Sequence, residues 1–191
     1  MAFYGSGGPT YGRGGAAQES TRGGGMMKLP SAFMTLEIRR ATIKDIKEIL
    51  PVWGQLADFH SELDPAFTPS PHWPREYGAY LRTLISRNDA IAVVARDDLD
   101  VVGYAVGRIT TLPSFFEHRY RGYIHDVFVK SEYRRRGIGR QLVEEILRWL
   151  SQHRVTLVEL TVAANNDAIP FWQRLGFHVY MHQMKKELES G

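Results

Sequence analysis

The sequence has no cysteine, no long apolar run and almost balanced charges. Without cysteine it cannot form a disulfide, a thiolate metal site or a cysteine nucleophile, and this usage is typical of a protein of the reducing cytoplasm. No stretch reaches the roughly 18 apolar residues of a membrane helix, so we expect no membrane contact. The formal net charge of +3 is too small to indicate a nucleic-acid-binding protein.

The first 33 residues differ in composition from the rest of the chain. They are rich in glycine and lack apolar periodicity, so burial cannot offset the entropy lost on ordering. We predict a flexible tail over 1–33 and one folded domain over 34–191. Gly-Arg segments in the tail faintly resemble RNA-binding tails; a solvated leader, or a start codon assigned too early with Met34 as the working start, is the preferred interpretation.

From residue 36 onward, strand-like and helix-like patterns alternate. Predicted strands span 36–41, 90–95, 101–111, 123–129, 155–163 and, as a strand or hairpin, 177–188. Predicted helices run from Thr42 until Pro51 interrupts, over 76–85, after Gly139, and over 166–175. This order predicts an α/β fold with a mixed central sheet flanked by helices.

The segment SEYRRRGIGRQLVEEIL, residues 131–147, joins a predicted strand to a predicted helix through consecutive arginines and two glycines. Amides in the first turn of a helix lack partners, and the helix dipole and arginines add positive potential, so the segment suits a phosphate group. It is neither a P-loop nor a dinucleotide fingerprint, because GxxxxGK[ST] and GxGxxG are absent. By itself it leaves open a phosphate site or a merely basic turn.

Two longer stretches, FVKSEYRRRGIGRQL and ELTVAANNDAIPFWQRLGF, resemble the GNAT superfamily of N-acyltransferases. That family's pattern is V-x-P-x-x-[RQ]-x-x-G-x-[GA], followed by N-x-x-A-x-x-F-Y-x-x-x-GF. The matching residues are Val129, Arg134, Gly137, Gly139, Asn165, Ala168, Phe171, Gly176 and Phe177. The resemblance covers residues 36–188 and implies the acyl-CoA N-acyltransferase fold, a mostly antiparallel sheet, and acetyl-CoA or a related acyl-CoA as cosubstrate.

The resemblance also implies where coenzyme A lies. Its pantetheine arm would pair with the backbone at the end of a strand, its pyrophosphate would meet the loop and first-turn amides, and its thiol would lie near the second motif. The implied cofactor-binding residues are Val127, Phe128, Val129, Arg134, Arg135, Arg136, Gly137, Ile138, Gly139, Arg140, Asn165, Ala168 and Trp172.

Amine acetylation needs a base for the attacking amine and a donor for the thioester oxygen. We expect His125 to be the base, since its unperturbed pKa near 6.5 suits the step and strand alternation puts it on one face with Val127. The N–H of Val127 is the expected donor. Tyr123 is an alternative acid or base, and a purely structural role is the alternative for His125. Asp126 is expected to bond a neighbouring loop from the opposite face.

Two positions depart from the family pattern. Trp172 stands where the family often has a tyrosine proposed to protonate the leaving thiolate, and an indole is no acid near neutral pH. Tyr133 or Tyr180 could assist instead, or the thiolate could leave unassisted. Ser131 replaces the usual proline at a small cost in rigidity. His178 and His182 are too widely spaced on a strand to chelate, so no metal is predicted.

The acceptor is less defined by the sequence. Acidic side chains precede and enter a stretch predicted as a loop, 60–74, and would suit a cationic amine, although a solvated loop is the simpler interpretation. The expected function is an acetyl-CoA-dependent N-acetyltransferase acting by direct attack on a primary amine of a small cationic molecule, such as a polyamine. A protein N-terminal or lysine acetyltransferase and a non-catalytic acyl-CoA-binding module are the alternatives. A homodimer is implied only because family members often are.

Overall fold

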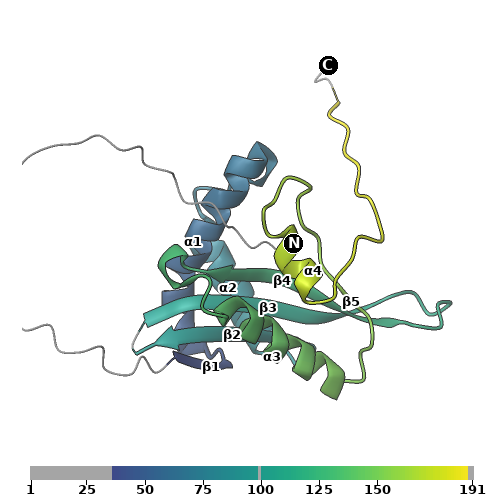
Figure 1. The fold of residues 1–191 in the computed structure, drawn as a ribbon, viewed down its shortest axis with the longest axis horizontal. Helices are drawn as coiled ribbons and strands as arrows, with labels where there is room; N and C mark the ends of the chain where they lie inside the picture. The colour runs from purple at the N-terminus through teal and green to yellow at the C-terminus, as the bar shows by residue number, and fades with distance from the viewer. Residues whose placement is uncertain (1–35, 99, 189–191) are drawn as a thin grey trace, which may run out of the picture.

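A computed structural model describes residues 36–98 and 100–188, so the predicted tail, 1–33, lies outside the described residues. At its centre is a five-stranded sheet in the order β1-β2-β3-β4-β5 (Figure 1). The strands are β1 Leu36–Arg40, β2 Ala90–Asp97, β3 Asp100–Thr111, β4 Tyr120–Val129 and β5 Val158–Glu159. Neighbours from β1 to β4 are antiparallel, and β5 alone runs parallel to β4.

Helices cover both faces of the sheet (Figure 1). The helices are α1 Ile46–Leu63, α2 Trp73–Ile85, α3 Ile138–Gln152 and α4 Ile169–Arg174, with 3-10 turns at Ile43–Asp45, Pro65–Phe67 and Ser131–Tyr133. Helices α1 and α2 pack on one face, and α3 and α4 pack on the other. The predicted fold class, a mixed and mostly antiparallel sheet flanked by helices, is confirmed.

Helix α3 lies unusually close to the sheet. Its apolar face includes Leu142, Val143 and Ile146, all fully buried. A Cβ on Gly107 of β3 would come within 2.7 Å of the Ile146 side chain, so a larger residue there would push the helix away. This contact fixes α3, and therefore its N-terminus, against β3 and β4.

Helix α1 starts at a buried carboxylate. The backbone N–H of Thr42 donates to Asp45 at 2.7 Å, as the predicted helix start requires. The guanidinium groups of Arg39 and Arg96 reach the same carboxylate at 2.8 and 3.1 Å. The hydrogen bond from Arg39 is the main cause that holds the pKa of Asp45 well below its usual range. These contacts tie the start of α1 to β1 and β2.

The prediction that Pro51 interrupts this helix is wrong, because α1 continues to Leu63. Proline removes one backbone donor and usually disfavours a helix interior. Here Pro51 is exposed, while Ile49, Val52 and Leu56 on the opposite face are buried, and that burial outweighs the local cost. The predicted loop 60–74 therefore begins inside α1 and ends inside α2.

The C-terminal part differs most from its prediction. Of the predicted strand 155–163, only Val158–Glu159 pairs, and residues 177–188 form no helix or strand in the described chain. Tyr180 nevertheless bonds the carboxylate of Glu159, and Lys185 Nζ lies 2.6 Å from Asp64 Oδ2. Side-chain contacts thus hold an extended segment whose alternation suggested a strand.

Candidate active site

The arginine-glycine loop joins the end of β4 to the start of α3. Gly137 has φ +80°, a conformation that side chains disfavour, and a Cβ there would meet nothing nearer than Gln141 Nε2 at 3.9 Å. The first helical bond of α3 runs from Gln141 N to the carbonyl of Gly137 at 3.1 Å. The backbone N–H groups ahead of Gln141 have no acceptor within the helix. The start of α3 therefore offers hydrogen-bond donors and the positive end of the helix dipole to a ligand.

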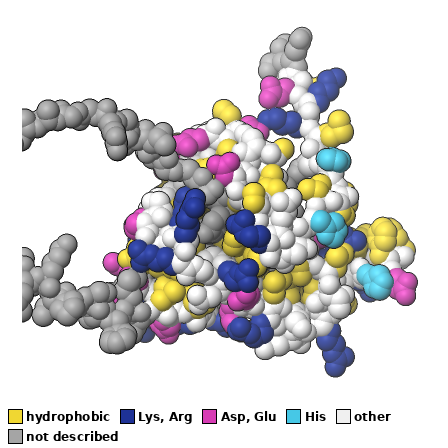
Figure 2. Space-filling model, viewed as in Figure 1, with side chains coloured by type: hydrophobic (Ala, Val, Ile, Leu, Met, Phe, Trp, Pro, Cys, Tyr) yellow, Lys and Arg dark blue, Asp and Glu magenta, His cyan; other side chains and the backbone are white. Residues whose placement is uncertain are grey.

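The three consecutive arginines of this loop do different things. Arg134 donates from Nε to the carbonyl of Val129 at 2.9 Å and stacks over Phe128 at 5.2 Å, so it closes the loop onto β4. Arg135 and Arg136 are exposed, as is Arg140 in the first turn. Ile138 and Gly139 are buried at the start of α3. Lys and Arg side chains gather near the middle of this face of the molecule (Figure 2).

Strands β4 and β5 separate near the start of β4, well before the loop. They pair only at Gly122 with Val158 and at Tyr123 with Glu159. Beyond Tyr123, the edge of β4 that faces away from β3 has no strand partner among the described residues. Val127, Phe128 and Val129 lie on that stretch, and all three side chains are buried. Their backbone is therefore the part of β4 that an extended ligand can reach.

A β-bulge interrupts β4 at His125. Val106 of β3 pairs with Asp126 and the next residue, Gly107, pairs with Ile124, so His125 is the extra residue. Ile124 and Val127 both pack into the core under α3. The two residues between them consequently face the α1–α2 side together.

The prediction that His125 shares a face with Val127 is therefore wrong, because strand alternation breaks at the bulge. The His125 ring meets Tyr123 edge-on, with centroids 4.8 Å apart. Its Nε2 is buried and has no hydrogen-bond partner among the described residues. Burial, and to a smaller extent the charge of Arg108, lowers the pKa of His125 from 6.5 to about 4. The imidazole is thus neutral at physiological pH.

Asp126 bonds a helix rather than the loop that was predicted. The Tyr77 hydroxyl, from α2, donates to Asp126 Oδ2 at 2.6 Å and lies 3.5 Å from the hydroxyl of Tyr104 on β3. Burial raises the pKa of the Asp126 carboxyl, while the bond from Tyr77 acts in the opposite direction. Burial and the nearby carboxylate raise the pKa of both tyrosines, so both remain protonated donors. Sequence reasoning missed this network.

The second motif places a buried tryptophan next to the sheet. Trp172 is 2% exposed and meets Phe177 edge-on at 5.5 Å, and its Nε1 has no partner among the described residues. Asn165 is exposed, whereas its neighbour Asn166 is buried and accepts the Ala168 N–H at 2.8 Å. The buried Nδ2 of Asn166 also lacks a partner in the described chain. Asn166 was not predicted.

The other predicted proton donors are already bonded. The Tyr123 hydroxyl lies 2.8 Å from Thr161 Oγ1, and the Tyr180 hydroxyl donates to Glu159. A hydrogen bond to Asp97 raises the pKa of Tyr133, and a hydrogen bond to Glu159 raises that of Tyr180. All three hydroxyls are therefore already engaged in hydrogen bonds within the chain.

These features form one arrangement: a split between two parallel strands, a bulged strand, and an arginine-glycine loop ahead of a helix. Residues 56–177 match the family model described as the Acetyltransferase (GNAT) family. The chain belongs to the GNAT family. It is an acetyl-CoA-dependent N-acetyltransferase, as its sequence motifs predicted.

Proteins similar to this chain include a named N-acetyltransferase and solved structures with the same fold. An uncharacterized N-acetyltransferase of Archaeoglobus fulgidus is 32% identical over 131 residues, which cover 69% of this chain and 84% of that protein. A mutant of the BH1408 protein from Bacillus halodurans has a TM-score of 0.72 and 26% identity, covering 80% of this chain and 99% of its own. A predicted acetyltransferase of Clostridium acetobutylicum, solved with acetyl-CoA, shares the fold with a TM-score of 0.66 at 15% identity, over 80% of this chain and 96% of its own.

The described residues fit acetyl-CoA on their own geometry. The unpaired edge of β4 offers backbone groups to an extended amide-bearing arm. The loop before α3 combines first-turn amides, an open position at Gly137 and exposed arginines, which suits a pyrophosphate. The cosubstrate supplies an acyl thioester, and these parts of the chain would position it.

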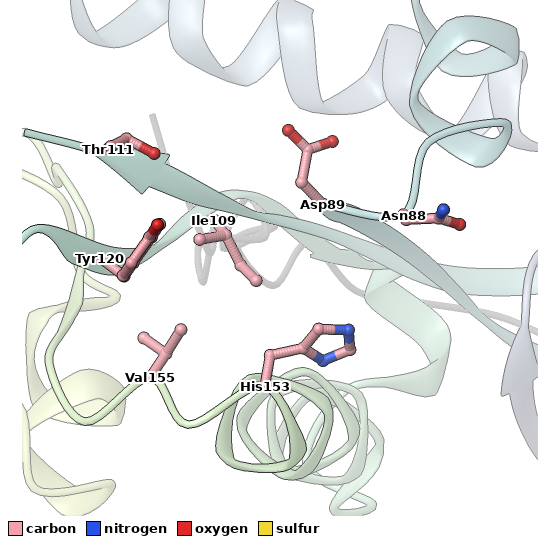
Figure 3. A pocket seen from close by; sticks show the side chains of 7 residues that line it. All are labelled: Asn88, Asp89, Ile109, Thr111, Tyr120, His153 and Val155. Carbon is pink, nitrogen blue, oxygen red and sulfur yellow. The ribbon is translucent and has the colours of Figure 1, made fainter.

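A hollow of about 320 Å³ lies at the opposite end of α3 from this loop (Figure 3). Its lining residues are Asn88, Asp89, Ile109, Thr111, Tyr120, His153 and Val155. None of these belongs to the predicted site. Within residues 36–98 and 100–188, no cluster of acidic and histidine side chains is arranged to hold a metal, and no helix has the length and hydropathy to span a bilayer.

Proposed function

We propose that the enzyme acetylates a primary amine of a small cationic molecule by direct attack within a ternary complex. The bulge in β4 is the main support for this proposal, because it turns His125 and Asp126 toward α1 and α2, away from the α3 core. The thioester would be held by β4 and the loop before α3, so the acceptor would approach from the α1–α2 side. Both substrates would then meet at the bulge.

His125 is the proposed base. An amine attacks only as the free base, and the neutral imidazole of His125, whose Nε2 is buried and unengaged, would take its proton once the acceptor or one water reaches that atom. A pKa of about 4 makes the imidazole a weaker base than usual but keeps it unprotonated at neutral pH. In the same step the amine nitrogen forms its bond to the carbonyl carbon, and the carbon–sulfur bond then breaks.

The backbone N–H of Val127, two residues beyond the bulge, is the proposed donor to the thioester oxygen. The leaving thiolate has an unperturbed pKa near 8.5, so it can depart without a strong acid. The Nε1 of Trp172 could donate a hydrogen bond to it, but an indole cannot release its proton there. We therefore assign no proton donor to the thiolate among the described side chains.

Acidic side chains on the acceptor side, Glu76 and the Asp126 whose pKa burial raises, support a cationic acceptor. Asp126 lies at the bulge beside His125, and Glu76 lies on the adjoining face of α2. The acidic residues that were predicted to line a loop are placed differently: Asp58 and Glu62 are on α1, and Asp64 pairs with Lys185. The support thus comes from α2 and β4 and not from residues 58–64.

The test is thiol release from acetyl-CoA with a panel of polyamines, amino acids, aminoglycosides and short peptides. We expect turnover with small polycationic amines and little with peptides. Turnover confined to peptide amines would contradict the small-molecule acceptor and indicate a protein acetyltransferase. Binding of coenzyme A without turnover on any amine would favour the non-catalytic acyl-CoA-binding module.

A further inference from the structure

A hollow of about 310 Å³ lies against the α1–α2 pair, on the side of the sheet that the β4 bulge faces. Its lining residues are Trp53, Pro69, Ser70, Trp73, Glu76, Tyr77 and Tyr80. Four of these seven are aromatic, and one is a carboxylate. The volume is at the lower end of the range for small-molecule sites, which is suitable for one compact group.

The aromatic rings form a continuous wall. Trp53 stacks on Tyr77 with centroids 4.3 Å apart, and it meets Trp73 at 4.7 Å. Tyr80 extends the wall, 5.8 Å from Tyr77. On α2 these rings recur at 73, 77 and 80, so they occupy one face of the helix.

Helix α1 makes room for this wall at Gly54. A Cβ on Gly54 would lie 3.2 Å from the Trp73 indole, tighter than an ordinary contact. Trp73 is also held by a hydrogen bond from its backbone N–H to the carbonyl of Ser70 at 3.1 Å. The Ser70 hydroxyl in turn donates to Glu76 at 2.7 Å and fixes the carboxylate at the rim. The hollow is therefore built by packing and hydrogen bonds.

We propose that this hollow binds a second cationic nitrogen of the acceptor, an alkylammonium or quaternary ammonium group, on its aromatic rings with Glu76 as counter-charge. Aromatic faces attract cations, and a nearby carboxylate adds Coulombic attraction that a neutral ligand would not gain. The inference rests on the proposed function and narrows its substrate class. The acceptor would have two nitrogens, one held in the hollow and one acetylated.

Tyr77 connects the hollow to the site of chemistry. Its ring is part of the wall, and its hydroxyl bonds Asp126, which is next to His125 at the bulge. A group in the hollow is thus separated from the bulge by about one tyrosine side chain. A short flexible spacer between the two nitrogens would span that separation.

Binding of choline is the test, measured by calorimetry on the full chain without acetyl-CoA, against the neutral isostere in which carbon replaces nitrogen. We expect choline to bind and the isostere to bind at least fivefold more weakly. Glu76→Gln and Tyr80→Leu should each weaken choline binding about fivefold. Their matched controls, Glu117→Gln and Tyr120→Leu, change an exposed acid and an exposed tyrosine outside the hollow. These controls should leave the affinity for choline unchanged.

Equal binding of choline and its isostere, no choline binding, or equal effects of test and control variants would each overturn the proposal. Because the assay needs no turnover, it separates the two claims. Charge-selective binding in an enzyme that acetylates no amine would refute the proposed function and keep the cation site. Acetylation of small cations with no effect of Glu76→Gln or Tyr80→Leu on acceptor KM would refute the cation site alone.

Discussion

The two sides of the candidate active site are built from different parts of the chain. The cofactor side, from Val127 to Arg140, is one continuous segment that offers mainly backbone groups and contains two left-handed residues, Arg135 and Gly137. The acceptor side combines α1, α2, β3 and β4 and consists of side chains such as Tyr77, Tyr104 and Asp126. In the proposed function the first side would bind a group common to a large family, whereas the second would determine which amine is used.

This difference predicts how each side tolerates change. Substitutions on the cofactor side should matter through conformation and should alter coenzyme affinity. Substitutions on the acceptor side should remove side-chain functional groups. They should therefore alter turnover or acceptor affinity while coenzyme binding is retained. The following variants test that separation.

His125→Ala has the largest expected effect. Loss of a positioned base typically costs 10²–10⁴-fold, so we expect kcat to fall about 100-fold or more while the Kd for acetyl-CoA stays unchanged. Rapid thiol-release kinetics and calorimetric titration with coenzyme A measure the two quantities. Tyr123→Phe is the control, because it keeps the ring beside His125 and removes only the hydroxyl that contacts Thr161. Its kcat should fall less than tenfold. An equal fall in kcat for the two variants would mean that His125 is not the base.

Gly137→Ala tests the cofactor side. A side chain at φ +80° costs about 1–2 kcal/mol, so the loop should leave its binding conformation and the Kd for coenzyme A should rise about tenfold. Gly176→Ala is a matched control, since Gly176 has φ +88°, open space around it and a place outside the loop. Both variants should lose similar stability in urea unfolding. Weakened coenzyme binding in both would show that the effect is general destabilisation.

The sequence predicts the conformation of the loop before α3 well, because the information for it is local. Loop position, glycine placement and the start of α3 follow from a short motif, and the element order follows from apolar periodicity. Long-range contacts explain the failures: α1 passes through Pro51 because its opposite face is buried, and His125 faces α2 because β4 gains one residue relative to β3. Tyr77 and Trp53 have no local signal, since only folding brings them to β4 and to each other.

Tyr77→Phe should have a moderate effect on the acceptor side. It removes the donor to Asp126 and keeps the ring, so a partly buried carboxylate loses a charge-assisted hydrogen bond worth about 1.5 kcal/mol. We expect acceptor kcat/KM to fall about tenfold with no change in coenzyme Kd. Tyr180→Phe, which removes a hydroxyl from Glu159 away from α2, is the control. Equal losses in both variants would argue that Asp126 has no special role in acceptor use.

The smallest expected effect is on the pH dependence of stability. Burial is the main cause that lowers the pKa of His60 and of His125 from 6.5 to about 4, so the native state stays unprotonated where the unfolded chain takes up protons. Stability should therefore be constant above about pH 7 and fall as the pH drops from 6.5 toward 4. Allowing for partial exposure, we expect His125 to account for about 1 kcal/mol of the loss between pH 7 and pH 5. Urea unfolding of wild type and His125→Gln at both pH values measures it, and the variant should lose less. An identical loss in the two proteins would mean that His125 titrates normally in the folded state, and its assignment as a neutral base at the bulge would fail with it.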